Sequence, residues 1–388
     1  MSVSLNDVVI VAYGRSAVGR AKKGSLRNTH PVDFAGQVLR QVVAKVPQLD
    51  PAEIGDVVVG CSKCEEVQGY NIGRLTCFKA GLPYSVPAQT VNRFCSSSLQ
   101  TIYTAANLIR TGDAEVAVAG GVETMSLLPM GTRDEVRYQW LKTHQPGAYM
   151  PMGLTAENVA EKYGVTREEM DLMAVESHRK AAAAQAEGRF KEQIVPVEAL
   201  DDEGTPFVFD KDEGIRPNAN MEDMAKLKPC FKEGGIVTAA TSSQMSDAAA
   251  FVVMMSAEKA KSLGAAPLAR FVSFAVAGVD PTLMGTGPIA AVPAALKRAG
   301  LTIDDMDVIE INEAFAAQAI PCIKELHMDP SKVNVNGGAM ALGHPLGATG
   351  AILTIKAISE LRRTSKRYGM VTMCIGGGMG AAAVFERI

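Results

Sequence analysis

Cys95 occupies a sequence context that favours chemistry. It follows a strand-like segment and opens a helix-like segment whose first turn is Ser96-Ser97-Ser98. A thiol at this position lies in the field of a helix N-terminus, which favours the thiolate, and Arg93 adds positive charge nearby. A cysteine between a strand and a helix is nevertheless more often structural than catalytic. Cys95 alone therefore does not decide the function.

Three further groups of this kind lie in the last third of the chain. His344 stands between a glycine and a proline in residues 336–350, a segment with five glycines. So much glycine brings the backbone close to a ligand and presents N–H donors, which favours a base or an oxyanion donor at His344 over a core role. Cys374 ends an apolar strand and enters a second glycine-rich turn. Asn312 follows another strand, where it is either a helix cap or a group that faces a ligand.

Two thiols, an imidazole and a carboxamide at four predicted strand ends favour a shared site. With no set of metal ligands and no nucleotide-binding fingerprint after a strand, this combination suits acyl transfer through a covalent thioester. Cys61 and Cys64 have the C-x-x-C spacing of zinc and redox sites, but no second pair accompanies them. We interpret them as two buried or half-buried thiols at the end of a strand.

The elements that must position these groups repeat loosely along the chain. Residues 31–46 are predicted as a helix and 56–60 as a strand, and 288–299 and 308–311 repeat that order. A second unit of strand, helix and strand also occurs twice, at 86–94, 95–111 and 114–119, and again at 332–336, 351–362 and 370–374. The repetition predicts a duplicated α/β fold with mostly parallel sheets. Residues 125–244 separate the copies and are too many for a plain connection, so we expect a folded insertion there.

Length and charge restrict the class of protein further. The chain has 388 residues, which predicts about two domains, and a formal net charge of −3 without a long basic run. Nucleic acid is therefore an unfavoured partner. No apolar stretch is long enough for a transmembrane segment, and seven scattered cysteines argue against a secreted disulfide framework. We expect a cytoplasmic protein.

Taken together, the motifs resemble those of the thiolase family, over residues 8–388. The resemblance rests on residues 92–98, 312–316, 336–350 and 374–380, in that order. It implies a five-layered αβαβα fold of two similar halves with an inserted loop domain. The expected boundaries are an N-terminal domain over 1–265, which contains a CoA-binding insertion at about 122–245, and a C-terminal domain over 266–388.

Carried onto this chain, the resemblance assigns a role to each of the four groups. Cys95 would attack the 3-keto carbon after His344 has taken its proton, and Cys374 would protonate the enolate of acetyl-CoA. The enolate oxygen would be held by His344 and by a water on Asn312. The oxyanion at the keto carbon would be held by the backbone N–H groups of Cys95 and Gly376.

The resemblance also implies a CoA site. CoA is a co-substrate, and no permanently bound cofactor is expected. Ser243 matches a serine that contacts the pantetheine, and Arg216 matches a basic residue near the adenine nucleotide. Met152 lies in a segment like the family's loop over the acyl site, and Met284 and Phe315 are expected to line the pocket. The alternative for these apolar residues is plain core packing.

Some details separate the subtypes. Many thiolases have glycine at the position of Ser98, and many also have glycine at the position of Ala248. Pro151 replaces a histidine that is usual in biosynthetic acetoacetyl-CoA thiolases, so the chain looks most like the degradative 3-ketoacyl-CoA thiolase of the bacterial fatty-acid oxidation complex. Residues 284–288 point toward the short-chain enzymes instead.

The resemblance further implies a homodimer or homotetramer, and a multifunctional hydratase/dehydrogenase subunit as a possible partner. Three alternatives stay open: an acetoacetyl-CoA thiolase working toward synthesis, a non-catalytic thiolase-like binding protein, and a ketoacyl synthase. The last is less consistent with a single histidine in a glycine-rich turn.

Overall fold

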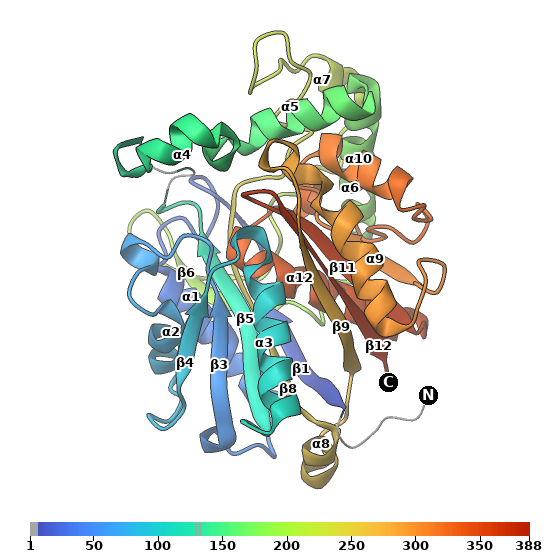
Figure 1. The fold of residues 1–388 in the computed structure, drawn as a ribbon. Helices are drawn as coiled ribbons and strands as arrows, with labels where there is room; N and C mark the ends of the chain where they lie inside the picture. The colour runs from blue at the N-terminus through green and yellow to red at the C-terminus, as the bar shows by residue number, and fades with distance from the viewer. Residues whose placement is uncertain (1–6, 129–130, 132–133) are drawn as a thin grey trace.

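The computed structural model describes residues 7–128, 131 and 134–388 (Figure 1). A ten-stranded sheet runs through the molecule in the order β10-β11-β12-β9-β1-β8-β5-β3-β4, with β2 paired to β8. The N-terminal half supplies β1 (Val8–Arg15), β2 (Gly19–Arg20), β3 (Ile54–Gly60), β4 (Ala88–Val91), β5 (Val116–Thr124) and β8 (Ser246–Ser256). The C-terminal half supplies β9 (Ala269–Gly278), β10 (Val308–Ile311), β11 (Tyr368–Ile375) and β12 (Met379–Arg387).

The two halves join where β1 pairs with β9. The junction is short, since it pairs only Val9 with Arg270 and Ile10 with Ala269. The expectation of mostly parallel sheets is wrong. Among the described strands, β10–β11, β3–β4 and β3–β5 are parallel, and the other pairs are antiparallel. Helical crossovers, which parallel pairing requires, connect the strands of these three pairs. The predicted strand–helix–strand units therefore account for these three pairs but not for the antiparallel ones.

Helices cover both faces of the sheet and fill the space between its halves, which gives five layers. One outer layer holds α1 (Pro31–Ala44) and α2 (Ile72–Ala80), the central layer holds α3 (Ser97–Thr111) and α12 (Leu346–Thr364), and the other outer layer holds α9 (Gly287–Ala299) and α10 (Ala316–Glu325). Three separate clusters of buried apolar side chains bind these layers together. Figure 1 shows α3 and α12 between the two groups of strands. The duplicated αβαβα architecture is confirmed.

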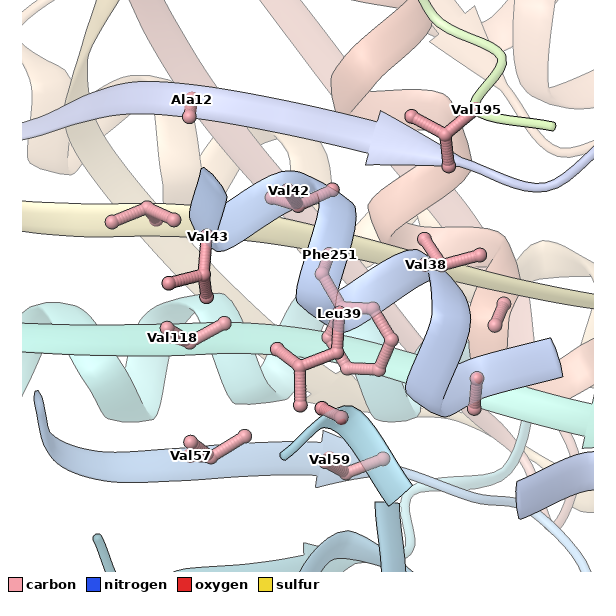
Figure 2. Packing of buried hydrophobic residues seen from close by; sticks show 14 of the residues in the cluster. Ala12, Val38, Leu39, Val42, Val43, Val57, Val59, Val118, Val195 and Phe251 are labelled. Atoms are coloured by element: carbon pink, nitrogen blue, oxygen red, sulfur yellow. The ribbon is translucent and has the colours of Figure 1, made fainter. Parts of the chain in front are cut away.

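The outer layer around α1 illustrates why these residues form these elements. Pro31 opens the helix, and the His30 side chain accepts the N–H of Val32 as a cap. Apolar residues then recur at helical spacing, so that one face is buried against the sheet. Figure 2 shows this face against strand residues of β3, β5 and β8; the helix residues are Val38, Leu39, Val42 and Val43, and the strand residues are Val57, Val59, Val118 and Phe251.

The predicted strand at 332–336 is not formed. Only Val333 makes an isolated bridge, to Ile309. The backbone turns instead at Asn334, whose φ is 42°. Its side-chain amide replaces the strand ladder, because it accepts the N–H of Ile311 at 3.0 Å and donates to the Ile311 carbonyl at 2.9 Å.

The segment between β5 and β8 is folded. It contains α4 (Gln139–His144), α5 (Met152–Tyr163), α6 (Arg167–Ala186), β6 (Val197–Leu200), β7 (Pro206–Phe209) and α7 (Met221–Ala225). Figure 1 shows α4, α5 and α7 across one end of the molecule. The short helices α8 (Ala257–Leu263) and α11 (Ala339–Leu342) complete the fold. None of the helices in the described part of the chain combines the length and the apolar character that crossing a bilayer requires.

Candidate active site

Cys95 lies in a tight turn at the end of β4, not in the first turn of a long helix as expected. The strand ends at Val91, a 3-10 turn spans Phe94–Ser96, and α3 begins at Ser97. Phe94 has a φ of 44°, a left-handed conformation that is uncommon for a bulky side chain. Asn92 holds it there, since its Oδ1 accepts the Phe94 N–H at 2.8 Å. The turn thereby fixes the position of the next residue, Cys95.

The Cys95 thiol is surrounded by apolar groups and by two backbone donors. Cys95 is 9% exposed and packs against Met125 and Leu346. The backbone N–H groups of Gly376 and of Cys95 itself favour the thiolate, but burial outweighs them and raises the pKa of Cys95 to about 11. The expectation that the helix N-terminus would favour a resting thiolate is therefore wrong. A base is needed to activate this thiol.

His344 is the candidate for this base. It lies between α11 and α12, is 5% exposed, and burial lowers its pKa to about 4, so that the ring is neutral at neutral pH. Nε2 lies 3.3 Å from the amide Nδ2 of Asn312, and Nδ1 lies 2.6 Å from Oγ1 of Thr349. Because the amide donates, Nε2 carries the lone pair and Nδ1 carries the proton that is donated to Thr349.

Cys374 and Asn312 occupy the ends of neighbouring parallel strands. β10 and β11 are in register from Val308 to Ile311, and the N–H of Asn312 donates to the Thr372 carbonyl at 2.9 Å. Cys374 is fully buried, and burial raises its pKa well above the ordinary value, with smaller contributions from Cys95 and Cys322. Cys374 therefore stays protonated. The buried Oδ1 of Asn312 has no partner among the described residues, so it is available to a ligand or a water.

The packing of α3 on α12 brings the N-terminal and C-terminal groups together. A side chain on Gly350 would lie 2.3 Å from the backbone N of Leu99, so only glycine permits this approach. At the same crossing, Ser98 Oγ accepts the N–H of Ala351 at 2.9 Å, which explains a serine where many relatives were expected to have glycine. Leu346, two residues after His344, thereby reaches Cys95. The packing of α3 on α12 therefore positions both Cys95 and the segment that carries His344.

Comparisons with known proteins identify the family. A model of the thiolase N-terminal domain matches residues 8–258, and a model of the C-terminal domain matches residues 265–387. The chain belongs to the thiolase family. A 3-ketoacyl-CoA thiolase of Bacillus subtilis is 50% identical over 98% of this chain and its own full length. A peroxisomal 3-ketoacyl-CoA thiolase of mouse is 46% identical over 99% of this chain and 91% of its own.

A solved structure gives the same result for the fold. The Bacillus anthracis acetyl-CoA acetyltransferase has a TM-score of 0.92, is 41% identical, and covers 100% of both chains. The thiolase fold is thus confirmed. The five predicted catalytic groups of this thiolase fall into two sets: Gly376 and Cys374 interact electrostatically with Cys95, and His344 is hydrogen-bonded to Asn312.

The apolar residues predicted for the acyl pocket also converge on this region of the thiolase. Met284 and Phe315 belong to the same buried cluster as Cys374, and Met152 packs against it. Met152 is also close to Gly376, since its sulfur would lie 3.8 Å from a side-chain carbon placed there. Ser243 is half-buried next to this cluster, where its N–H donates to the Ala314 carbonyl at 2.9 Å.

Arg216 differs from these residues. It is exposed, and its backbone N–H donates to Nδ1 of His178 on α6 at 3.1 Å. No described contact joins its side chain to the catalytic groups. This separation is compatible with a role at the distant adenine end of CoA, which stays a prediction.

Sequence reasoning missed three residues that hold the site in place. Thr349 orients His344, Asn92 holds the Cys95 turn, and the buried Glu123 accepts the N–H of Gly347 at 2.8 Å beside His344. Thr349 lies in the glycine-rich segment and could have been noticed there as a polar neighbour of the histidine. Glu123 gives no local signal, because it ends a strand more than two hundred residues before its partner.

Proposed function

We propose that this protein is a 3-ketoacyl-CoA thiolase, an acyltransferase that cleaves 3-ketoacyl-CoA with CoA to acetyl-CoA and an acyl-CoA two carbons shorter. The observation that carries the proposal is the environment of Cys95. The backbone N–H groups of Gly376 and of Cys95 itself favour negative charge at the thiol, and an oxyanion hole beside the acylated sulfur needs such donors. Relatives named 3-ketoacyl-CoA thiolase, at up to 50% identity, support the same substrate class.

In the first step, Cys95 becomes acylated. His344 takes the thiol proton at Nε2, and the resulting thiolate attacks the 3-keto carbon. The N–H groups of Cys95 and Gly376 then stabilise the oxyanion, a kind of interaction that is worth about 3 kcal/mol per donor. Because Nδ1 of His344 carries the proton donated to Thr349, the thiol proton goes to the lone pair of Nε2, in place of the hydrogen bond from Asn312.

Carbon–carbon cleavage follows. The bond between C2 and C3 breaks, the oxyanion collapses to a thioester on Cys95, and the electron pair passes to the enolate of acetyl-CoA. His344 and a water on Asn312 stabilise the enolate oxygen, and Cys374 delivers its proton to C2. In the second half-reaction, the thiol of free CoA attacks the thioester and releases the shortened acyl-CoA. No permanently bound cofactor takes part.

Bound CoA is proposed to lie across the inserted segment. Its pantetheine arm contacts Ser243, its adenine end reaches the exposed Arg216, and the acyl chain lies among Met152, Met284 and Phe315. The burial of Met284 and Phe315 beside Cys374 supports this placement of the acyl group. The proposed insertion remains at about 122–245, and the proposed division between the two domains at residue 265.

An acetoacetyl-CoA thiolase is the second candidate. Two observations favour it. The fold matches that of an acetyl-CoA acetyltransferase. Met284, which is buried, opens the segment 284–288 that points toward the short-chain enzymes. Steady-state kcat/KM with 3-ketoacyl-CoA substrates of increasing chain length separates the two. The proposal requires turnover of medium and long chains at least as efficient as that of acetoacetyl-CoA. Activity confined to acetoacetyl-CoA would reject it in favour of the second candidate, and no turnover of any ketoacyl-CoA would indicate a non-catalytic binding protein.

We further propose a cytoplasmic homodimer or homotetramer. β4 is the last strand in the sheet order, so one of its edges is open to pairing with a second copy. Tyr84, which is 86% exposed, and Phe78, which is 47% exposed, lie beside this edge on the α2 side. Analytical ultracentrifugation tests the assembly, and co-purification from the source cell tests the hydratase/dehydrogenase partner. A monomer at micromolar concentration would reject the oligomer.

A further inference from the structure

Cys61 and Cys64 form a pair of thiols outside the catalytic cluster. Cys61 directly follows β3 and is fully buried, whereas Cys64 is exposed. The Cys64 thiol donates to the Cys61 carbonyl oxygen at 3.2 Å. The C-x-x-C turn thus folds back on itself, so that the Cys64 side chain lies against the backbone of Cys61.

The two residues between these cysteines hold the loop that carries His344. The N–H groups of Ser62 and Lys63 donate to the Glu123 carboxylate at 2.8 and 3.2 Å. The same carboxylate accepts the N–H of Gly347 at 2.8 Å. A side chain on Gly347 would lie 2.8 Å from the Cys61 Cα, so the two segments are packed without free space. A change of backbone at 61–64 is therefore transmitted to the start of α12.

The same segment also holds the nucleophile turn. Asn92 donates from Nδ2 to the Ser62 carbonyl at 3.0 Å while its Oδ1 accepts the N–H of Phe94. The Cys61 N–H donates to the Val91 carbonyl at 3.1 Å, at the end of the strand that leads to Cys95. The cysteine pair is thus bonded to both parts of the active site.

The two thiols differ in reactivity. The neighbouring Cys61 side chain lowers the pKa of Cys64, although burial and the charges of Glu123 and Glu65 oppose this. The neighbouring Cys64 side chain raises the pKa of Cys61, as does the burial of Cys61. Cys64 is therefore the accessible thiol with more thiolate character, and Cys61 is the buried thiol that can resolve a mixed disulfide.

We propose that Cys61 and Cys64 form a dithiol site that reacts with low-molecular-weight disulfides, and that the resulting protein disulfide lowers thiolase activity by displacing the 61–64 turn. The effect on activity rests on the proposed function, but the formation of the bond does not. Such a site is distinct from Cys95 and Cys374, which the mechanism uses.

The chemistry balances as thiol–disulfide exchange. The Cys64 thiolate attacks one sulfur of the small disulfide, whose S–S bond breaks and releases one small thiolate. That thiolate takes up from water the proton that Cys64 lost on ionising. Cys61 then loses its proton to water and attacks the Cys64 sulfur of the mixed disulfide, which releases the second small thiolate to take up that proton. Two protein thiols are oxidised, and one small disulfide is reduced to two thiols.

Disulfide formation changes the contacts of the turn. The two sulfur atoms must approach to about 2.05 Å with a Cβ–S–S–Cβ dihedral near 90°. The Cys64 thiol loses its hydrogen bond to the Cys61 carbonyl, and the intervening Ser62 and Lys63 must adjust. Because both bond to Glu123 or Asn92 through their backbone, the positions of Cys95 and His344 shift. A displacement of the nucleophile by about 1 Å can cost on the order of a hundredfold in rate.

Glutathione redox buffers test the proposal on the full-length protein. After equilibration at a series of reduced-to-oxidised ratios, samples are quenched with acid, alkylated and digested with trypsin. Lys63 separates the two cysteines, so a disulfide joins the peptides 46–63 and 64–74, each with a single cysteine. We expect this linked pair to appear as the buffer becomes oxidising, with an activity loss of about tenfold that reductant reverses.

Cys64→Ser and Cys230→Ser serve as the variant and its matched control, because both remove an exposed cysteine. The Cys64→Ser protein should resist the reversible loss, and the Cys230→Ser protein should not. Absence of the linked pair at every ratio would overturn the proposal, as would its formation with equal activity losses in wild type and Cys64→Ser. Absence of thiolase activity in fully reduced wild type would instead reject the proposed function, and the linked peptides would still report on the bond.

Discussion

Cys95 and Cys374 are both buried thiols beside a glycine-rich or serine-rich turn, but their surroundings differ. Cys95 lies after β4 in a strained turn and receives N–H groups from Gly376 and from its own backbone. Cys374 lies within β11, in an apolar cluster with Met284 and Phe315, and among the described residues its own N–H is the one group that favours its thiolate. The pKa of Cys95 is raised to about 11, whereas that of Cys374 is raised well above its ordinary value.

The different surroundings explain how two thiols can take opposite roles, one as a nucleophile and one as an acid. Backbone donors around a sulfur stabilise negative charge, so Cys95 can be deprotonated by a neutral imidazole and can carry an oxyanion on its acyl group. An apolar cluster disfavours charge, so Cys374 holds its proton until a carbanion takes it. The proposed nucleophile and the proposed acid follow from these environments.

Replacing the nucleophile has the largest expected effect. Cys95→Ala should lower kcat/KM for ketoacyl-CoA cleavage by about 10⁴-fold, because no covalent intermediate can form. Cys77→Ala is the matched control, since it removes another buried thiol, from α2. If the Cys95→Ala protein, with an unchanged circular dichroism spectrum, cleaves substrate at more than a few per cent of the wild-type rate, the assignment is wrong.

Replacing the acid should separate the two thiols by reaction step. Cys374→Ala should lower carbon–carbon cleavage by about 10³-fold, since the enolate loses its proton donor. Exchange of radiolabelled CoA into acetyl-CoA uses only Cys95 and His344, so it should persist. Equal loss of cleavage and exchange would contradict separate roles for the two thiols.

The pH dependence of alkylation tests the protonation state of Cys95. Iodoacetamide reacts with the thiolate, whose fraction rises with pH until the pKa is passed. With a pKa of about 11, the alkylation rate of the Cys95 peptide should rise about tenfold per unit between pH 7 and pH 10. The measurement is mass spectrometry of that peptide over time. A plateau reached near pH 7 would mean that the thiol is already ionised at rest.

Weakening the support of His344 has the smallest expected effect. Thr349→Val removes the hydroxyl that receives the Nδ1 proton at 2.6 Å, which should lower kcat about tenfold. Thr349→Ser keeps the hydroxyl and should restore most of the rate without a change in KM. If valine and serine behave alike, Thr349 contributes packing and not orientation.

Much of the fold could be predicted from local patterns. The observed bounds of β10 and α9 agree with the predicted ranges to within one residue, because apolar spacing marks both elements clearly. The strand expected at 332–336 failed for a long-range reason. The Asn334 amide bonds to Ile311 and so replaces a strand ladder, and no local pattern encodes such a pairing.

The site was predictable as a set of residues but not as a set of protonation states. The sequence next to Cys95 contains a predicted helix N-terminus and Arg93, both of which favour the thiolate. The dominant influence is burial by Met125 and Leu346, which lie far away in the sequence. Glu123 was missed for the same reason. Its partners at Ser62, Lys63 and Gly347 come from both halves of the chain.

Trapping the acyl-enzyme tests the central claim most directly. Reduced protein is mixed with a 3-ketoacyl-CoA in the absence of free CoA, quenched in acid within the first turnovers, and digested for mass spectrometry. The proposed mechanism predicts that the peptide containing Cys95 gains the mass of the shortened acyl group, and that added CoA removes it. An acyl group found only on Cys374 or another residue, or no acyl group on protein that turns over substrate, would contradict the role of Cys95.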